Sequence, residues 1–358
     1  MNIALVVTNL QGGGAEKAMI TLAATLRANG HEVCLILLED IRQHGVPEGL
    51  PILALTPPGK PLSKGWLGKW LAAWRLRRVW SRQHPFDLVI STLPFADEVC
   101  RKARLPHHWM RIANTLSSEI NALRQKDPVK AARRLARYRG LYADQSLIAV
   151  SNGAGEDLSV NLAIQPRQLR VIHNLFDFER MRQLAKMPVE GVPESPYVIH
   201  VGRFARQKRH DLLLDAWQIL ETPHQLVLLT EPCSKLEQWI VERGLKNRVR
   251  IVGFQPNPYP WIARAELLVL CSDHEGMPNV LIESLACGTP VVSTDCPSGP
   301  RELLLSAIPE ALVPMNDAKA LADRIHRLLT HSYDPSRVDL SAFTPAVTIA
   351  ALESLEKP

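Results

Sequence analysis

The stretch CSDHEGMPNVLIESLACGTPVVSTDCPSGPREL, residues 271–303, decides the fold. It overlaps a short apolar run, residues 266–271, which is typical of a strand buried on both faces of a parallel sheet. A helix is expected to begin near Pro278, where a missing backbone N–H costs nothing, and to end at Gly288. A second buried strand follows at residues 290–294. This order predicts an α/β protein in which the helix N-terminus lies at the carboxyl edge of the sheet, a place that favours anions.

Two glutamates in this unit, Glu275 and Glu283, are eight positions apart. The first precedes the helix and the second lies inside it, so both can contact a ligand bound at the helix start. Carboxylates suit the hydroxyls of a sugar or a ribose, because they accept charge-assisted hydrogen bonds, which are the stronger kind. The alternative is an ordinary strand–helix–strand unit with surface carboxylates.

The segment EGMPNVLIESLACGTPVVSTD resembles the signature of retaining nucleotide-sugar glycosyltransferases of family 4. The resemblance implies the GT-B fold, in which two Rossmann-like domains with parallel sheets face one another across a central cleft. It also implies that Glu275 contacts the donor sugar and that Glu283 binds the nucleotide ribose. The backbone between them would hold the diphosphate, through the donor-binding positions Gly276, Met277, Pro278, Asn279 and Val280.

A second motif, Gly202-Arg-Phe-Ala-Arg-Gln-Lys208, follows another strand-like run. It places Arg203 and Lys208 at the carboxyl end of a strand, where two cations can neutralise a diphosphate leaving group and lower the barrier to glycosyl transfer. The spacing is similar to that of the family's phosphate-binding pair, which implies that Arg203, Lys208 and Glu275 are catalytic. Because the cations take this role, no metal and no cofactor are expected. The alternative is a solvated basic turn.

Two further segments resemble donor-binding loops of the family. Gly12, Gly13 and Gly14 follow the first strand, and glycine allows a backbone to approach a phosphate closely. The run GGGAEK is not the dinucleotide fingerprint, because Lys17 occupies the place of the third glycine. It resembles the GG-x-ER loop that touches the donor in the family; a tight turn is the alternative. Near Phe254, the chain resembles the strand and loop that frame the base.

The acceptor side is expected near Asn114 and Ser117, after a strand of the first domain. Many family members carry a histidine near this place, whereas this chain has Asn114. An amide cannot act as a base, so its role would be to hydrogen-bond a hydroxyl group.

Length and composition agree with two soluble globular domains. The chain has 358 residues, of which 46% are hydrophobic and 22% charged. Its six cysteines include no C-x-x-C pair, which predicts reduced structural thiols in a cytosolic protein. A strand directly after Met1, and no run of about 18 apolar residues, predict that the protein has neither a signal peptide nor a membrane span.

The basic residues are concentrated in the first half of the chain. Residues 60–139 contain 18 Lys and Arg but only 5 Asp and Glu. Within them, residues 66–80 have helical periodicity, and an aromatic face beside a basic cluster suits an interfacial membrane helix. A core-facing aromatic stripe with a solvated basic end is the alternative, and nucleic acid is disfavoured because no binding module accompanies the charge. The residues of this face and cluster are Trp66, Trp70, Trp74, Arg75, Arg77 and Arg78.

The proline-rich segment 187–196 predicts a linker. Residues 1–186 would form the acceptor domain, residues 197–340 the donor domain, and residues 341–358 a helix that crosses back to the first domain. The resemblance covers nearly the whole chain and is most specific at residues 198–303.

The resemblance implies that a hexose or N-acetylhexosamine moves, with retention, from a nucleotide diphosphate sugar to an acceptor. UDP is the expected nucleotide, and no carboxylate is an obvious nucleophile, so front-face attack is expected. The basic first domain suggests a lipid-linked saccharide acceptor at the cytoplasmic face of the plasma membrane, as in bacterial polysaccharide assembly. Two alternatives remain open: a soluble glycosyltransferase acting on a small sugar or protein, and a catalytically silent sugar-nucleotide-binding protein.

Overall fold

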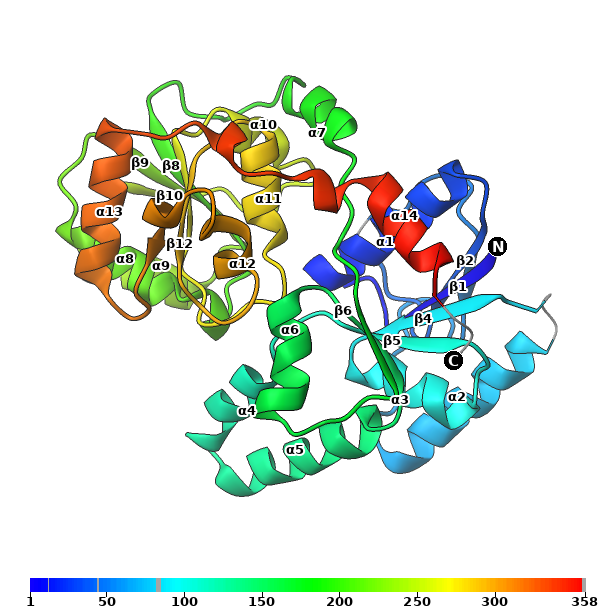
Figure 1. Cartoon of the computed structure of the whole chain (residues 1–358). Helices are drawn as coiled ribbons and strands as arrows, with labels where there is room; N and C mark the ends of the chain where they lie inside the picture. The colour runs from blue at the N-terminus through cyan, green and yellow to red at the C-terminus, as the bar shows by residue number, and fades with distance from the viewer. Residues whose placement is uncertain (12, 44, 82–84, 356–358) are drawn as a thin grey trace. The chain divides into compact units, whose positions relative to one another are not determined.

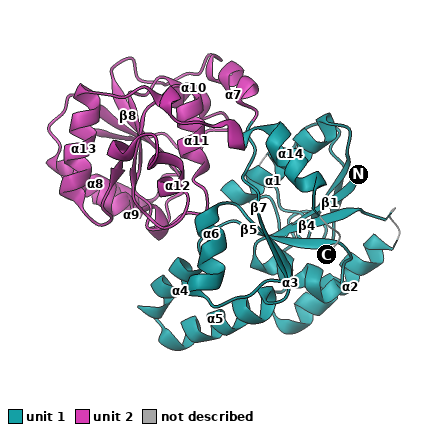
Figure 2. Ribbon diagram, viewed as in Figure 1, with its two compact units in different colours: residues 1–176, 343–358 teal, residues 177–342 magenta. Residues whose placement is uncertain are grey.

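The computed structural model describes residues 1–11, 13–43, 45–81 and 85–355 (Figure 1). The chain divides into two compact units: residues 1–176 with 343–358, and residues 177–342 (Figure 2). The predicted first domain extended to residue 186, but helix α7 (Phe178–Ala185) lies in the second unit. The reason is packing, because α7 buries Met181 and contacts helices α10 (Tyr259–Ala263) and α11 (Asn279–Ala286) of that unit.

The first unit is built on a seven-stranded parallel sheet with the order β3-β2-β1-β4-β5-β6-β7. Strand β1 pairs with both β2 and β4, so the strand order reverses there, at the point where open α/β sheets bind ligands. The strands are β1 (Asn2–Val7), β2 (Glu32–Leu37), β3 (Ile52–Ala54), β4 (Leu88–Thr92), β5 (His108–Ile112), β6 (Ser146–Ala149) and β7 (Gln168–Val171).

Helices cover both faces of this sheet, and alternation along β1 shows how. Ile3, Leu5 and Val7 join a core with α1 (Gly14–Ala28) and α14 (Pro345–Glu353). Ala4 and Val6 point to the other face, toward α2 (Trp66–Trp80) and α3 (Pro94–Ala103). The remaining helices of the unit are α4 (Leu116–Arg124), α5 (Pro128–Tyr142) and α6 (Asn152–Glu156).

Helix α14 belongs to the first unit, although all of the second unit separates it in sequence from β7. Ile349 and Leu352 are buried in the same core as β1 and α1. The chain segments that enter and leave the second unit are paired, since the backbone N–H of Phe176 donates to the carbonyl of Phe343 at 2.8 Å.

The second unit contains a six-stranded parallel sheet with the order β10-β9-β8-β11-β12-β13. Its order reverses between β8 and β11. The predicted strand–helix–strand unit is confirmed as β11, α11 and β12. The strands are β8 (Tyr197–Val201), β9 (Gln225–Leu229), β10 (Val249–Ile251), β11 (Leu267–Leu270), β12 (Val291–Thr294) and β13 (Leu312–Val313). The helices not yet named are α8 (His210–Ile219), α9 (Ser234–Glu242), α12 (Pro300–Leu304) and α13 (Ala318–Thr330).

The aromatic face of α2 points away from the core. Trp66, Trp70 and Trp74 are 68%, 47% and 56% exposed, whereas Ala72, Ala73 and Leu76 form the buried face. The core-facing alternative for the stripe of Trp66, Trp70 and Trp74 is therefore wrong, although Trp80 at the end of the helix packs against the core.

Candidate functional site

The predicted catalytic residues of the second unit come from two loops at the β8/β11 reversal. One loop follows β8 (residues 202–209) and the other follows β11 (residues 271–278). Their backbones are joined by a hydrogen bond from the N–H of Asp273 to the carbonyl of Gln207 at 2.8 Å. The Gln207 side chain also donates to the carbonyl of His274 at 2.5 Å. These bonds align the two sequence motifs side by side.

The alignment brings two predicted catalytic residues into contact. Lys208 Nζ lies 2.6 Å from Glu275 Oε1, and the two side chains are 21% and 10% exposed. The same Oε1 accepts a hydrogen bond from Ser272 Oγ at 2.5 Å. Removing either partner of such a partly buried ion pair would leave the other charge uncompensated, which is costly. The pair therefore forms an organised cation–carboxylate centre at the sheet edge.

The arginines of the first loop have different surroundings. Arg203 is exposed, and within the described ranges its guanidinium makes no hydrogen bond or ion pair. Arg209, which the sequence does not single out, lies 2.8 Å from Asp273 and 3.1 Å from Asp211. Arg209 thus ties the two loops together, whereas Arg203 and Arg206 are exposed to solvent.

Helix α11 begins beside this centre. Its N-cap is Pro278, which has no side-chain acceptor for the first N–H groups of the helix. The positive end of the helix dipole makes such a start suitable for a phosphate. Residues 276–280 form the loop end and the first turn at this helix start. They are buried except for Asn279, which is partly exposed.

A glycine that the sequence does not single out shapes the same place. Gly299, in the loop after β12, has a positive φ of 37°. A Cβ atom there would lie 2.3 Å from Pro278 Cδ and 3.1 Å from the carbonyl oxygen of Gly276. Only glycine allows this close approach. The signal in the sequence is the run Pro297-Ser-Gly-Pro300, which is typical of a turn.

The other predicted donor-binding residues lie in the same unit. Glu283 is buried within α11 and accepts a hydrogen bond from Tyr259 of α10 at 3.5 Å. Phe254 follows β10 and is exposed. Gly202 begins the loop after β8, and Thr230 Oγ1 donates to its carbonyl at 2.7 Å.

Two buried histidines, His200 of β8 and His210 of α8, flank the Gly202 loop in sequence. Thr230 already donates its proton to Gly202, so it accepts from His210 Nε2 at 3.1 Å. His200 Nδ1 donates to the carbonyl of Val269 at 2.9 Å, and the two imidazole rings are 4.7 Å apart. Burial lowers the pKa of His200 well below its usual range and that of His210 to about 4, so both are neutral near pH 7. They fix the loop without adding charge.

The glycine loop of the first unit lies at that unit's own reversal point, after β1. Gly14 begins α1, and Gly13 is its N-cap with an extended backbone. A Cβ at Gly13 would lie 2.0 Å from a carboxylate oxygen of Glu16, so this side chain folds over the positive end of the helix. Gly12, also predicted to contact the donor, lies outside the described residues.

The predicted acceptor residues follow β5 in the first unit. The Asn114 side-chain oxygen accepts from the backbone N–H of Thr115 at 2.9 Å. Ser117 is buried in the first turn of α4, and its backbone N–H donates to Asp157 at 3.0 Å. Both residues therefore shape the start of α4.

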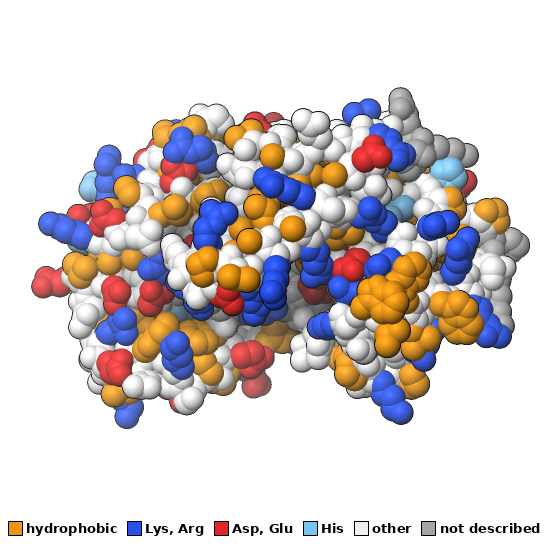
Figure 3. Space-filling model, turned by 90° about the horizontal axis from the view of Figure 1, so that it is seen from below, with side chains coloured by type: hydrophobic (Ala, Val, Ile, Leu, Met, Phe, Trp, Pro, Cys, Tyr) orange, Lys and Arg blue, Asp and Glu red, His pale blue; other side chains and the backbone are white. Residues whose placement is uncertain are grey.

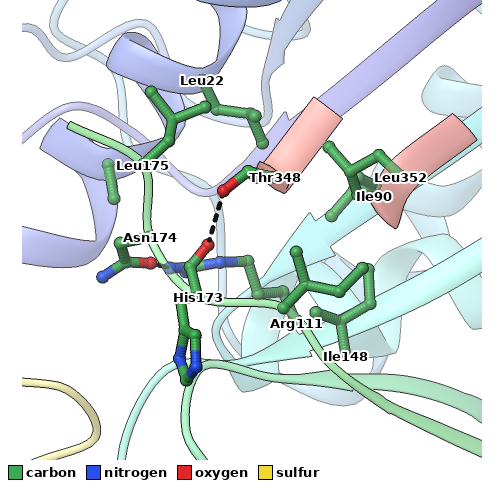
Figure 4. Close-up of a pocket in the computed structure, with 11 residues that line it drawn as sticks. Leu22, Ile90, Arg111, Ile148, His173, Asn174, Leu175, Thr348 and Leu352 are labelled. Carbon is green, nitrogen blue, oxygen red and sulfur yellow. Dashed lines mark hydrogen bonds between the residues drawn. The ribbon is translucent and has the colours of Figure 1, made fainter. Parts of the chain in front are cut away.

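Arg111 of β5, three residues before Asn114, is another polar residue that the sequence does not single out. It is 6% exposed and lines a cavity of about 20 Å³, roughly the space of one water (Figure 4). Its guanidinium donates to Thr92 Oγ1 at 3.4 Å and to the side-chain oxygen of Asn174. Burial lowers the pKa of Arg111 to about 10. On the other side of the cavity, Thr348 of α14 donates to the carbonyl of His173 at 3.4 Å.

Comparisons with known proteins agree with this architecture. Residues 13–175 match the family described as Glycosyl transferase 4-like domain, and residues 195–331 match Glycosyl transferases group 1. The chain is 30% identical over 305 residues to N-acetylgalactosamine-N,N'-diacetylbacillosaminyl-diphospho-undecaprenol 4-alpha-N-acetylgalactosaminyltransferase of Campylobacter jejuni, covering 84% of this chain and 82% of that one.

Two further similarities come from a curated relative and a solved structure. The chain is 30% identical over 164 residues to the lipopolysaccharide core biosynthesis glycosyltransferase LpsE of Rhizobium meliloti, covering 46% of this chain and 48% of that one. Its fold is similar to that of Anabaena HepE, solved in complex with UDP and glucose, with a TM-score of 0.68, 20% identity, and coverage of 99% and 95% of the two chains. Together with the two parallel-sheet units, these matches show that the chain belongs to the family 4 glycosyltransferases with the GT-B fold.

Proposed function

We propose that this glycosyltransferase is a retaining, metal-independent enzyme that transfers a hexose or N-acetylhexosamine from a UDP-linked sugar to a lipid-linked saccharide in bacterial glycan assembly. The observation that carries the donor part is the contact between Lys208 and Glu275 at the β8/β11 reversal, beside the start of α11. A cation, a carboxylate and a helix N-terminus together match the leaving phosphate, the sugar hydroxyls and the diphosphate of such a donor.

In this reaction the bond between the anomeric carbon and the phosphate oxygen breaks. The acceptor hydroxyl oxygen forms its new bond on the same face of the sugar, and its proton passes to the departing phosphate. Lys208 and Arg203 stabilise the negative charge that develops on that phosphate, which is the role that a metal ion would otherwise fill. Glu275 orients the sugar through its hydroxyls, and Glu283 binds the ribose.

Two similarities guide the choice of substrates. The name of the Campylobacter relative includes a diphospho-undecaprenol acceptor, which supports a saccharide linked to a polyprenyl diphosphate. The Anabaena structure contains UDP, which makes uridine the first nucleotide to test.

The surface of the first unit supports an acceptor held in a membrane. The exposed tryptophans of α2 lie among cations, with Lys102 Nζ 4.7 Å from the ring centre of Trp70 and Arg78 5.4 Å from that of Trp74. In Figure 3, large hydrophobic side chains are exposed beside Lys and Arg side chains. Such a face suits the headgroup region of an anionic bilayer. We place the enzyme at the cytoplasmic face of the plasma membrane as a peripheral protein. Among the described residues, no helix is long and apolar enough to cross a bilayer.

The test is release of nucleotide diphosphate from a panel of UDP-, GDP- and ADP-linked sugars, with a polyprenyl-diphosphate-linked saccharide as acceptor. We expect release that depends on the acceptor, and a product with the anomeric configuration of the donor. An inverted product would contradict retention. A donor that binds but is never turned over with any acceptor would favour the silent sugar-nucleotide-binding protein.

A further inference from the structure

Ser272 is the first polar side chain after β11 and is completely buried. Both its side chain and its backbone are held. Its hydroxyl donates to Glu275 Oε1 at 2.5 Å, and its carbonyl accepts from Thr294 Oγ1 at 2.8 Å. Thr294 ends the neighbouring strand β12 and is buried as well. Ser272 is therefore fixed to the ends of two adjacent strands of the sheet.

Glu275 Oε1 thus accepts from two donors of unlike mobility. The Ser272 hydroxyl sits on a short, buried side chain, whereas the Lys208 ammonium ends a long side chain that is 21% exposed. In the proposed reaction Lys208 must turn toward the charge that develops on the donor phosphate. As the ammonium shifts, its ion pair with the Glu275 carboxylate weakens, although Glu275 is only 8% exposed. A nearly buried carboxylate that loses a partner needs another hydrogen bond to keep its position.

We propose that Ser272 is a positioning residue, which holds the Glu275 carboxylate in place for the donor sugar while Lys208 engages the donor diphosphate. This inference rests on the proposed function of the same site. The hydroxyl does not touch the reacting atoms. It acts through the carboxylate, because its hydrogen bond to a charged oxygen fixes the Glu275 side chain against the sugar. Displacement of a substrate-orienting group by about 1 Å is sufficient to lower turnover about a hundredfold.

The first test compares Ser272→Ala with Ser293→Ala. Ser293 is also completely buried and lies on the adjacent strand β12, but its hydroxyl donates to the backbone carbonyl of Thr294 and not to Glu275. A hydrogen bond to a charged group corresponds to a change of about tenfold to a hundredfold. We therefore expect Ser272→Ala to lower kcat by that factor with the donor KM changed less than about threefold. Ser293→Ala should retain kcat within about twofold at a similar loss of melting temperature.

The second test asks whether the hydroxyl acts through Glu275. If it does, adding Ser272→Ala to a Glu275→Gln variant lowers kcat little further, because the carboxylate to be positioned is already absent. Ser272→Cys keeps the side chain's shape but donates weakly, so it should give an intermediate kcat, and it replaces Ser272→Ala if the latter does not fold.

Three results would overturn the inference: wild-type kcat in Ser272→Ala, equal losses in the Glu275→Gln and wild-type backgrounds, or an equal loss in Ser293→Ala. Each requires that the unaltered enzyme turns over. Absence of turnover in the unaltered enzyme across all donors would instead refute the proposed function, so the two failures are distinguishable.

Discussion

The carboxyl edges of the two sheets have corresponding places in the fold but different chemistry. In the second unit, Lys208 and Glu275 form a partly exposed ion pair beside a helix start. In the first unit, Arg111 of β5 is buried, and its guanidinium donates to the uncharged side chains of Thr92 and Asn174. A mobile, accessible charge can respond to a charged ligand, whereas a buried one mainly holds loops together. We therefore expect the charged groups that act on the donor to come from the second unit, and Arg111 to hold the loops of the first unit in place.

The strongest test of this comparison is Lys208→Ala. Loss of one fixed donor to a developing charge lowers kcat about a thousandfold, and binding of the ground-state donor should fall much less. Turnover by nucleotide diphosphate release and donor affinity by calorimetry measure the two quantities. Lys235→Ala, which removes an exposed lysine of the same unit, is the control and should behave as the unaltered enzyme. Equal losses in kcat and donor affinity would contradict a transition-state role for Lys208.

The first unit should bind anionic membranes through the exposed tryptophans of α2 and the cations beside them. Replacing Trp66, Trp70 and Trp74 together by alanine removes three exposed indoles, at about 1 kcal/mol each for half-buried rings. We expect binding to vesicles that contain anionic lipid to weaken about a hundredfold. Ile219→Ala with Val241→Ala, which removes exposed apolar side chains from the second unit, should leave it unchanged. If all variants co-sediment equally with vesicles, or if co-sedimentation does not depend on anionic lipid, the tryptophan face of α2 is not the membrane-binding surface.

A buried carboxyl makes the stability of the first unit depend on pH. Asp97 accepts from Ser91 at 2.5 Å and from Tyr142 at 2.8 Å, and burial raises its pKa to about 7. A carboxyl whose folded-state pKa is raised stabilises the fold at low pH, and this contribution is lost as the pH rises from about 4 to about 7. Between pH 5 and pH 7 the loss is about 2 kcal/mol.

Asp97→Asn should remove this dependence. Urea unfolding at pH 5, 6 and 7 would then show that the unaltered protein loses about 2 kcal/mol relative to the variant over this range. Asp144→Asn, which replaces an exposed carboxylate, controls for net charge. Parallel stability profiles for the unaltered protein and Asp97→Asn would show that the Asp97 carboxyl does not titrate in this range.

The smallest expected effect concerns the shape of the donor site. Gly299→Ala introduces both backbone strain and a clash with Pro278, whereas Gly244→Ala introduces strain alone, because Gly244 has a φ of 68° and no atom near the added Cβ. Gly299→Ala should be less stable than Gly244→Ala by about 1 kcal/mol and should bind nucleotide more weakly. Identical melting temperatures and nucleotide affinities for the two variants would show that the loop after β12 can move to accommodate the added Cβ without a loss of stability.

The sequence predicts the strand–helix–strand unit of residues 266–294 because the apolar runs indicate the strands, and Gly288 and Pro290 mark the end of the helix between them. It does not predict helix α3, because the helix starts directly after β4, from Leu93 in a positive-φ conformation that no local pattern indicates. Strand β3 has only three residues, in a segment whose proline and glycine content is typical of a loop. Local patterns identify long elements, whereas short ones depend on the neighbours that they pair with.

The candidate site divides in the same way. The resemblance to the family points to Arg203, Lys208 and Glu275, but the basic loop also contains Arg206 and Arg209. Which arginine is held by carboxylates depends on the distance to Asp273, far away in sequence, so only the folded chain distinguishes Arg209 from Arg203. The Ser272 contact and the closeness of Gly299 to Pro278 likewise depend on how adjacent strand ends meet.

The place of α14 in the first unit has a consequence for synthesis on the ribosome. Ile349 and Leu352 complete a core whose other members include residues of β1 and α1, and they are synthesised after the whole of the second unit. Domains usually fold as they emerge, the N-terminal one first. Here the second unit, which is continuous in sequence, is complete before the first can close, so we expect the order of co-translational folding to run from the second unit to the first.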